Sequence, residues 1–179
     1  MNKAKYKLKG LPPVYCINLD GEPHRWEAAE NMFKEWDIEN YTRVSAYDGR
    51  EDDLSDILKG KYPDGMSSSE VGCTTSHLKA MKMFLETDEP CAIMMEDDCD
   101  ISTALHWGFT WKDFYAKMPY DYDVIQLAII NPATVYAQLH RRFINDFSTA
   151  CYLITRHHAE KLVRLHCRGD KYKIDQDSK

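Results

Sequence analysis

The 179-residue sequence lacks several features that would place it in a familiar class at once. It has no apolar run near the roughly 20 residues that a membrane-spanning helix needs, and its Lys-rich start lacks the apolar stretch of a signal peptide. Basic residues are outnumbered by acidic ones, 23 to 29, which gives a net charge of −6, whereas a nucleic-acid partner favours a basic face. We therefore expect a cytoplasmic protein with no transmembrane segment and no nucleic-acid partner.

Closely spaced cysteine pairs and glycine-rich phosphate loops are also absent. The six cysteines form no C-x-x-C pair, which argues against a structural zinc site and favours reduced thiols. Three of them, Cys16, Cys91 and Cys151, lie inside apolar runs typical of a core. Neither G-x-x-x-x-G-K nor G-x-G-x-x-G occurs, and this counts against a Mg²⁺-dependent nucleotidyltransferase without excluding one.

The sequence alternates short apolar segments with amphipathic ones, which is typical of an α/β fold with a largely parallel sheet. The predicted strands are residues 14–19, 41–46, 91–95, 124–130 and 149–154, of which 124–130 is expected to be a central strand. The predicted helices begin at Pro23, at a Ser67–Glu70 capping box, before Trp107 and at Thr155. The third of these helices is expected to run to Met118, with a stripe of aromatic residues. We expect one domain over residues 13–179, preceded by an extension over 1–12.

An abrupt change from apolar to acidic residues is the most informative local feature. The run 91–95 is typical of a strand covered on both faces, and Glu96, Asp97 and Asp98 follow it directly, with Asp100 beyond. In open α/β sheets, ligands bind beyond the carboxyl ends of the strands. Mg²⁺ and Mn²⁺ prefer oxygen ligands, often one or two carboxylates with substrate phosphates. The sequence therefore predicts a Mn²⁺ or Mg²⁺ site with three candidate ligands, which are Glu96, Asp98 and Asp100.

Strand geometry separates the three adjacent acids, because successive side chains point to opposite faces. Glu96 and Asp98 are expected on one side, with Asp98 as the favoured metal ligand and Glu96 near metal-bound water or a ribose. Asp97 is expected on the opposite side, where it would hold a neighbouring loop. A solvated acidic turn at the end of a strand would leave the same sequence pattern.

Three residues of the predicted helix after Ser67 carry further expectations. Ser76 and His77 are adjacent, so their side chains diverge by about 100° around a helix and cannot form a nucleophile–base pair; this argues against a Ser-His hydrolase. Gly72 lies early in the helix, where glycine is unfavourable by about 1 kcal/mol relative to alanine. That penalty indicates a close approach of either another backbone or a ligand.

A set of short motifs along the chain resembles a known enzyme family. The motifs lie at residues 15–20 with Arg25 soon after, at 46–49, 70–77 and 95–98, and at 152–154 with 159–162. In this order they resemble the family 25 glycosyltransferases, which include lipopolysaccharide-type transferases and the collagen galactosyltransferases. The resemblance covers about residues 13–165.

The resemblance implies a GT-A-type, Rossmann-like fold and a glycosyltransferase, here a hexosyltransferase. It also implies a UDP-hexose donor such as UDP-galactose, Mn²⁺ or Mg²⁺ at the acidic motif, and a glycan or protein acceptor, as in lipopolysaccharide biosynthesis. By position, the resemblance implies a donor site made of nine residues, namely Asn18, Leu19, Arg25, Asp48, Gly49, Gly72, Ser76, His77 and Asp97. Arg25 is expected either to contact the diphosphate through its forked guanidinium or to be a solvated cation on its helix.

The candidates for the catalytic base lie near the end of the sequence. Family members usually carry a further acidic segment after the last helix, where this chain offers Asp170, Asp175 and Asp177. Asp175 and Asp177 are therefore the positional candidates for the base, and the shortness of the segment could impair the enzyme. A non-catalytic module that binds a nucleotide-sugar or a glycan is the alternative that this shortness favours.

Overall fold

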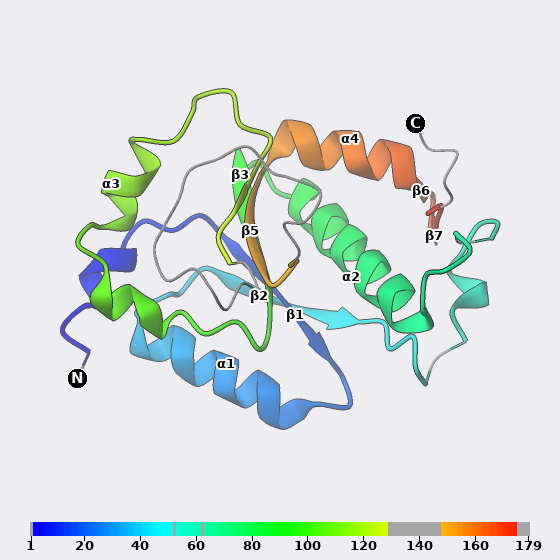
Figure 1. Ribbon diagram of the computed structural model, residues 1–179, viewed down its shortest axis with the longest axis horizontal. Helices are drawn as coiled ribbons and strands as arrows, with labels where there is room; N and C mark the ends of the chain where they lie inside the picture. The colour runs from blue at the N-terminus through cyan, green and yellow to red at the C-terminus, as the bar shows by residue number, and fades with distance from the viewer. Residues whose placement is uncertain (1, 52, 62, 129–147, 175–179) are drawn as a thin grey trace.

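A five-stranded sheet forms the centre of the computed structural model, which describes residues 2–51, 53–61, 63–128 and 148–174 (Figure 1). Its strands are β1 (Val14–Leu19), β2 (Tyr41–Ala46), β3 (Cys91–Glu96), β4 (Val124–Gln126) and β5 (Cys151–Thr155). They lie in the order β2-β1-β3-β5-β4. Strand β1 pairs in parallel with β2 and β3, while β5 is antiparallel to both β3 and β4. Only β5 runs in the reverse direction, which confirms the predicted mostly parallel sheet.

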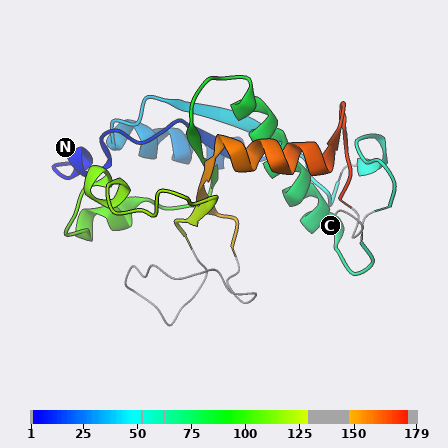
Figure 2. The same cartoon turned by 90° about the horizontal axis from the view of Figure 1, so that it is seen from above.

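Helices cover both faces of this sheet, as predicted (Figures 1 and 2). The helices are α1 (Pro23–Glu35), α2 (Ser68–Leu85), α3 (Trp111–Tyr115) and α4 (Arg156–His166). Helices α2 and α4 pack together on one face, and their core includes Phe84 and Ala159. Helices α1 and α3 lie on the other face with a second core that includes Phe33 and Trp111. We call these the α2 face and the α1 face.

Strand β3 explains why a continuous apolar run marks the centre of the sheet. Its residues alternate between the two cores, with Ala92 and Met94 on the α2 face. Ile93 and Met95 lie on the α1 face. Both faces are therefore covered, and every position of the run is buried before the chain reaches Glu96.

Several helix starts follow the predicted local chemistry. Pro23 occupies the first turn of α1, where its missing N–H leaves no hydrogen bond unmade. Ser67 and Glu70 form the predicted capping box of α2. Thr155 caps α4 by accepting a hydrogen bond from the backbone N–H of His158 at 3.2 Å. These three helices begin at the predicted residues. A helix start depends on hydrogen bonds within a few residues of the chain, so it can be predicted from the local sequence.

The predicted helix from Trp107 to Met118 is present only over Trp111–Tyr115, which is α3. The chain instead forms a short 3-10 helix, Ser102–His106, and then restarts as α3 at a second capping box, made by Thr110 and Asp113. Trp107 lies outside this helix, and its ring stacks on that of Phe109 with the ring centroids 5.0 Å apart.

The predicted strand over 124–130 also differs from the structure. Strand β4 covers three residues and lies at the edge of the sheet rather than at its centre; residues 129 and 130 lie outside the described part. Strand β5 begins at Cys151, two residues later than expected.

The terminal segments add small elements that the sequence pattern did not indicate. Residues Lys5–Leu8 form a 3-10 helix that buries Leu8 in the core of the α1 face. Near the other end, β6 (Cys167–Arg168) and β7 (Lys171–Tyr172) form a two-stranded ribbon. Among the described residues, no helix has the length and apolar character needed to cross a membrane.

Candidate functional site

The candidate site lies where the carboxyl ends of three parallel strands meet. Strands β1, β2 and β3 run in the same direction, so their ends share one edge of the sheet. The backbone N–H of Asp97 donates to the carbonyl of Ile17 at 3.1 Å and joins the acidic motif to β1. This edge is where open α/β sheets bind ligands.

Asp97 and Asp98 both lie beside Arg25 of α1, but in different environments. The side chain of Asp97 is only 5% exposed, and Arg25 donates to its Oδ1 while Asn18 donates to its Oδ2 at 2.6 Å. The side chain of Asp98 is 62% exposed, and its Oδ2 lies 3.1 Å from Arg25 Nη2. Asp97 therefore holds the cluster together, while Asp98 presents a carboxylate to solvent.

The expected alternation of the acids is right for two of them and wrong for Asp98. Glu96, the last residue of β3, points to the α2 face, and Asp97 points to the α1 face. The strand ends at Glu96, and a turn then brings Asp98 to Arg25 beside Asp97 rather than back beside Glu96. Extrapolating a strand past its last residue caused this error.

Arg43 of β2 is a member of this cluster that sequence reasoning missed. Its Nε and Nη2 donate to Asn18 Oδ1 at 2.9 and 2.6 Å, and Nη2 also donates to Asp20 at 2.8 Å. Hydrogen bonds from the Ser45 hydroxyl and then from Arg43 lower the pKa of Asp20. The available signal was a single cation within the predicted strand 41–46.

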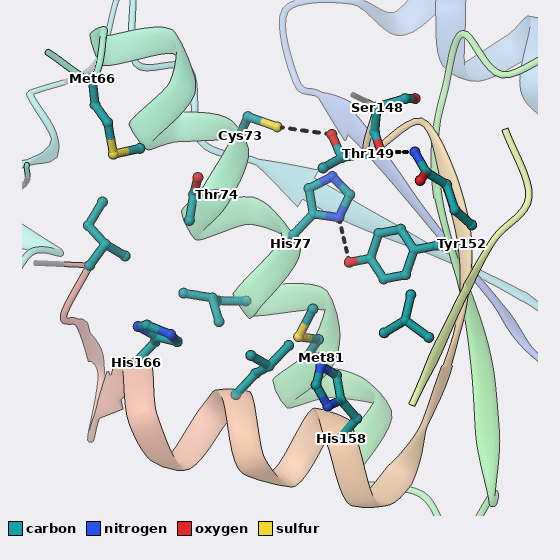
Figure 3. Close-up of a pocket in the computed structure, with 15 residues that line it drawn as sticks. Met66, Cys73, Thr74, His77, Met81, Ser148, Thr149, Tyr152, His158 and His166 are labelled. Atoms are coloured by element: carbon teal, nitrogen blue, oxygen red, sulfur yellow. Dashed lines mark hydrogen bonds between the residues drawn. The ribbon is translucent and has the colours of Figure 1, made fainter. Parts of the chain in front are cut away.

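On the α2 face, Glu96 and His77 form a second polar group with Tyr152 of β5 and with Thr149, which lies just before that strand. His77 Nε2 lies 3.3 Å from Glu96 Oε1, which also accepts a hydrogen bond from the hydroxyl of Thr149 at 2.5 Å. His77 Nδ1 lies 2.9 Å from the Tyr152 hydroxyl (Figure 3). Buried His77 is therefore paired at both ring nitrogens.

The electrostatics of this pair favour its charged forms. The hydrogen bond from His77 lowers the pKa of Glu96, against the opposing effect of burial. Burial alone would lower the pKa of His77, but its hydrogen bonds with Cys73 and Glu96 outweigh burial and raise it. Burial raises the pKa of Tyr152, so its hydroxyl stays protonated at neutral pH.

Cys73 completes a compact group of possible metal ligands. Cys73 and His77 are four residues apart on α2 and so share one side of the helix. The Cys73 sulfur, a His77 ring nitrogen and a Glu96 carboxylate oxygen all lie within 4.8 Å of one another. Among the described residues, this is the one such group of three; Glu96, Asp98 and Asp100 do not converge in this way.

A cavity of about 440 Å³ opens beside His77, between α2, α4 and the end of β5 (Figure 3). Its polar end includes Cys73, His77 and Thr149. Its apolar end includes Met81 and Leu162. The volume lies in the range of sites for small ligands.

Gly72 and Gly49 allow α2 to approach the loop after β2. A Cβ on Gly72 would lie 2.6 Å from the carbonyl oxygen of Tyr47 and 2.7 Å from the backbone nitrogen of Gly49. A Cβ on Gly49 would lie 1.8 Å from the carbonyl oxygen of Ser68. Of the two explanations open for Gly72, the structure supports close approach of another backbone.

Ser76 strengthens the same junction. Its hydroxyl donates to the carbonyl of Gly72 at 2.6 Å and accepts from the backbone N–H of Tyr47 at 2.8 Å. Both its donor and its acceptor are thus used within the protein, and the side chain is buried. The junction anchors the loop that carries Asp48.

The other predicted site residues lie apart from these clusters or outside the described chain. Leu19 ends β1, and Asp48 pairs with Arg50, whose hydrogen bonds lower the pKa of Asp48 to about 2. Asp100 accepts hydrogen bonds from the backbone N–H and the hydroxyl of Ser102, both at 2.7 Å. Asp175 and Asp177 lie outside the described residues.

Comparison with known proteins indicates the protein family to which the chain belongs. No curated protein matches the chain in sequence. Residues 11–176 match the family described as Glycosyltransferase family 25 (LPS biosynthesis protein). The match contains all the strands and helices that build the strand-end site. With most of its length matched, the chain belongs to glycosyltransferase family 25.

Proposed function

We propose that this glycosyltransferase moves a hexose, galactose or glucose, from a UDP-sugar to a hydroxyl group of a glycan or protein acceptor. The observation that carries the proposal is the contrast between buried Asp97 and exposed Asp98 at the strand ends. Asp97 and Arg25 form a buried, fixed ion pair, and Asp98 presents its exposed carboxylate beside the same guanidinium. This arrangement suits a diphosphate bridged to the protein by a metal ion.

A divalent cation fits the donor set at Asp98. Mn²⁺ and Mg²⁺ take oxygen ligands and often use one or two carboxylates together with substrate phosphates and water. Asp98 offers an exposed carboxylate, whereas both oxygens of Asp97 are already engaged. When bound, such a cation would neutralise the charge on the leaving diphosphate. We therefore assign the metal to Asp98 and not to the set of three acids expected from the sequence.

The residues around Asp98 would orient the donor. Asp97, itself fixed by a hydrogen bond from Asn18, holds Arg25 at the edge of the sheet. There the guanidinium, 35% exposed, can reach a diphosphate oxygen. Fixed groups of this kind speed a transfer by keeping the reacting atoms in line. The catalytic base remains a prediction at Asp175 and Asp177.

The first test is the thermal stability of the protein with UDP, UDP-galactose and UDP-glucose, each with Mn²⁺ or with a chelator. A ligand at 100 times its Kd stabilises a protein by about 2.7 kcal/mol, which gives a measurable shift in melting temperature. We expect a shift that requires both the UDP moiety and Mn²⁺. The absence of a shift with every UDP compound would contradict the proposed donor class.

A matched pair of variants tests the assignment of the metal to Asp98. Asp98→Asn should abolish the Mn²⁺-dependent shift, because it removes the exposed charge at the diphosphate site. Asp100→Asn removes the same charge two residues away but keeps an acceptor for Ser102, so it should bind donor normally. Both variants should keep the stability of the unliganded protein within about 0.5 kcal/mol, since both positions are exposed. The reverse pattern would move the metal to Asp100.

Measuring turnover distinguishes an active transferase from a module that only binds the nucleotide-sugar. Release of UDP from the sugar donor, measured with and without a candidate acceptor, should require Mn²⁺ and fail in Asp98→Asn. Donor binding with no release of UDP under any condition would instead identify a nucleotide-sugar binding module.

A further inference from the structure

We propose that Cys73, His77 and Glu96 form a second metal site, selective for a soft divalent ion such as Zn²⁺ and separate from the cation expected at Asp98. The proposal does not depend on the transferase reaction, since it rests on side chains of the α2 face alone. Its three ligand atoms lie within 4.8 Å of one another.

The spacing of the ligand atoms fits a tetrahedral ion. Zn²⁺ binds sulfur at about 2.3 Å and nitrogen or oxygen at about 2.0–2.2 Å, so ligand atoms at tetrahedral angles lie about 3.3–3.7 Å apart. His77 Nε2 and Glu96 Oε1 are already 3.3 Å apart. Cys73 lies one helical turn before His77, on the same side of α2. Small rotations of the side chains would therefore bring all three atoms around one ion.

The types of ligand select a different metal from the one proposed at Asp98. A thiolate and an imidazole favour Zn²⁺ and similar ions, whereas Mn²⁺ and Mg²⁺ favour oxygen. On binding, Cys73 would lose its thiol proton to solvent, and His77 would offer the lone pair of Nε2. The single ring proton would then lie on Nδ1 and be donated to the Tyr152 hydroxyl, which lies 2.9 Å away.

The surroundings complete the site. A histidine that binds metal commonly donates its other N–H to a neighbouring group, which fixes the orientation of the ring. Tyr152 provides that group for His77. The cavity lies against Cys73, His77 and Thr149, so a water molecule, or the Thr149 hydroxyl, can take the fourth position. The absence of a C-x-x-C pair argued against a structural zinc site, but that test does not detect ligands drawn from a helix and a strand.

Titration of the reduced, chelator-treated protein with Co²⁺ tests the proposal, because a tetrahedral Co²⁺–thiolate complex has a charge-transfer band in the near ultraviolet. We expect one equivalent of Co²⁺ to produce this band, and Zn²⁺ to displace it. Cys73→Ser should abolish the band. His77→Gln, Glu96→Gln and Tyr152→Phe should each weaken Zn²⁺ binding at least about tenfold. Thermal unfolding in chelator verifies that each variant is folded.

Two controls separate this site from other thiols and from the proposed donor site. Cys167→Ser removes another half-buried thiol, away from the cavity, and should leave the band unchanged. Asp98→Asn should keep Zn²⁺ binding while losing the Mn²⁺-dependent binding of UDP-sugars. No band in the folded wild-type protein, or a band that persists in Cys73→Ser, would overturn the proposal. Equal loss of Zn²⁺ binding in Asp98→Asn would show that the two metal sites are one.

Discussion

At the scale of single residues, the three adjacent acids of the motif, Glu96, Asp97 and Asp98, have different partners and different exposure. Glu96 turns to His77, Asp97 is enclosed by Arg25 and Asn18, and Asp98 is exposed. Asp97 and Asp98 are the same type of residue and differ in exposure and hydrogen bonding. Both oxygens of buried Asp97 are engaged, so its carboxylate has little capacity left for a ligand. The same side chain can therefore be a structural anchor at one position and a candidate ligand at the next.

The pair of His77 and Glu96 predicts a pH-dependent contribution to stability. Glu96 has a pKa lowered from 4.5, so its contribution is present above about pH 4.5 and is lost as the pH falls through the lowered pKa. His77 has a pKa raised from 6.5, so its contribution is present below about pH 6.5 and is lost as the pH rises through the raised pKa. The coupling should therefore be largest between these two values.

Denaturant unfolding across the pH range, in chelator, measures this coupling. A double-mutant cycle with His77→Gln and Glu96→Gln should give about 1.5–3 kcal/mol within that window, as for a hydrogen bond between charged groups. It should decline at alkaline pH, where the imidazole is neutral. A coupling energy that does not vary with pH would contradict the assigned charge states.

At the scale of elements, the site depends on how closely α2 approaches the loop after β2. Gly72 and Gly49 supply the space, and the Ser76 hydroxyl bonds to both sides of the contact. The contact also determines where α2 places Cys73 and His77 relative to the end of β3. Gly72, Gly49 and Ser76 thus act through the placement of α2.

Gly72→Ala should destabilise the protein by about 1–3 kcal/mol, although alanine favours a helix over glycine by about 1 kcal/mol. The new Cβ would meet the backbone at Tyr47 and Gly49, and backbone atoms cannot rotate away as side chains can. Gly108→Ala, where nothing lies within 4 Å of the added Cβ, is the matched control and should be nearly neutral. Unfolding in urea measures both, and similar effects in the two variants would contradict this explanation.

At the scale of the whole molecule, the two cores protect thiols of the central sheet. Burial raises the pKa of Cys16 to about 12. A hydrogen bond with Cys99, followed by burial, raises the pKa of Cys151. All six cysteines are free thiols in the structure, as predicted. The reactivity of these thiols therefore reports the opening of the domain.

Cys16 and Cys151 should resist alkylation in the native protein and react only when the domain opens. Half-buried Cys73 should react much faster. Pulse labelling with mass spectrometry at increasing denaturant should give one shared opening free energy for the two buried thiols. Fast labelling of Cys16 in native buffer would contradict a closed core on the α1 face.

Much of the fold could be predicted because local signals act over a few residues. The Ser67–Glu70 capping box, Pro23 and the apolar run at 91–95 each placed an element correctly. The start of the helix predicted over Trp107 to Met118 was wrong, because the capping box of Thr110 and Asp113 begins the helix at Trp111. The extent and edge position of β4 could not be predicted, since a short apolar run does not show how many neighbours its strand will have.

The sequence by itself determined the α/β class, the family and the strand end at which the acids gather, because hydrophobic periodicity and ordered motifs are local properties of the chain. Only the tertiary structure decided which acid is exposed, which cation lies beside it, and that Cys73 and His77 meet Glu96. Those pairings join residues far apart in sequence, such as Arg25 with Asp97 and Tyr152 with His77. They exist because helix packing on two faces of one sheet brings such residues within hydrogen-bonding distance, and no local pattern encodes that distance.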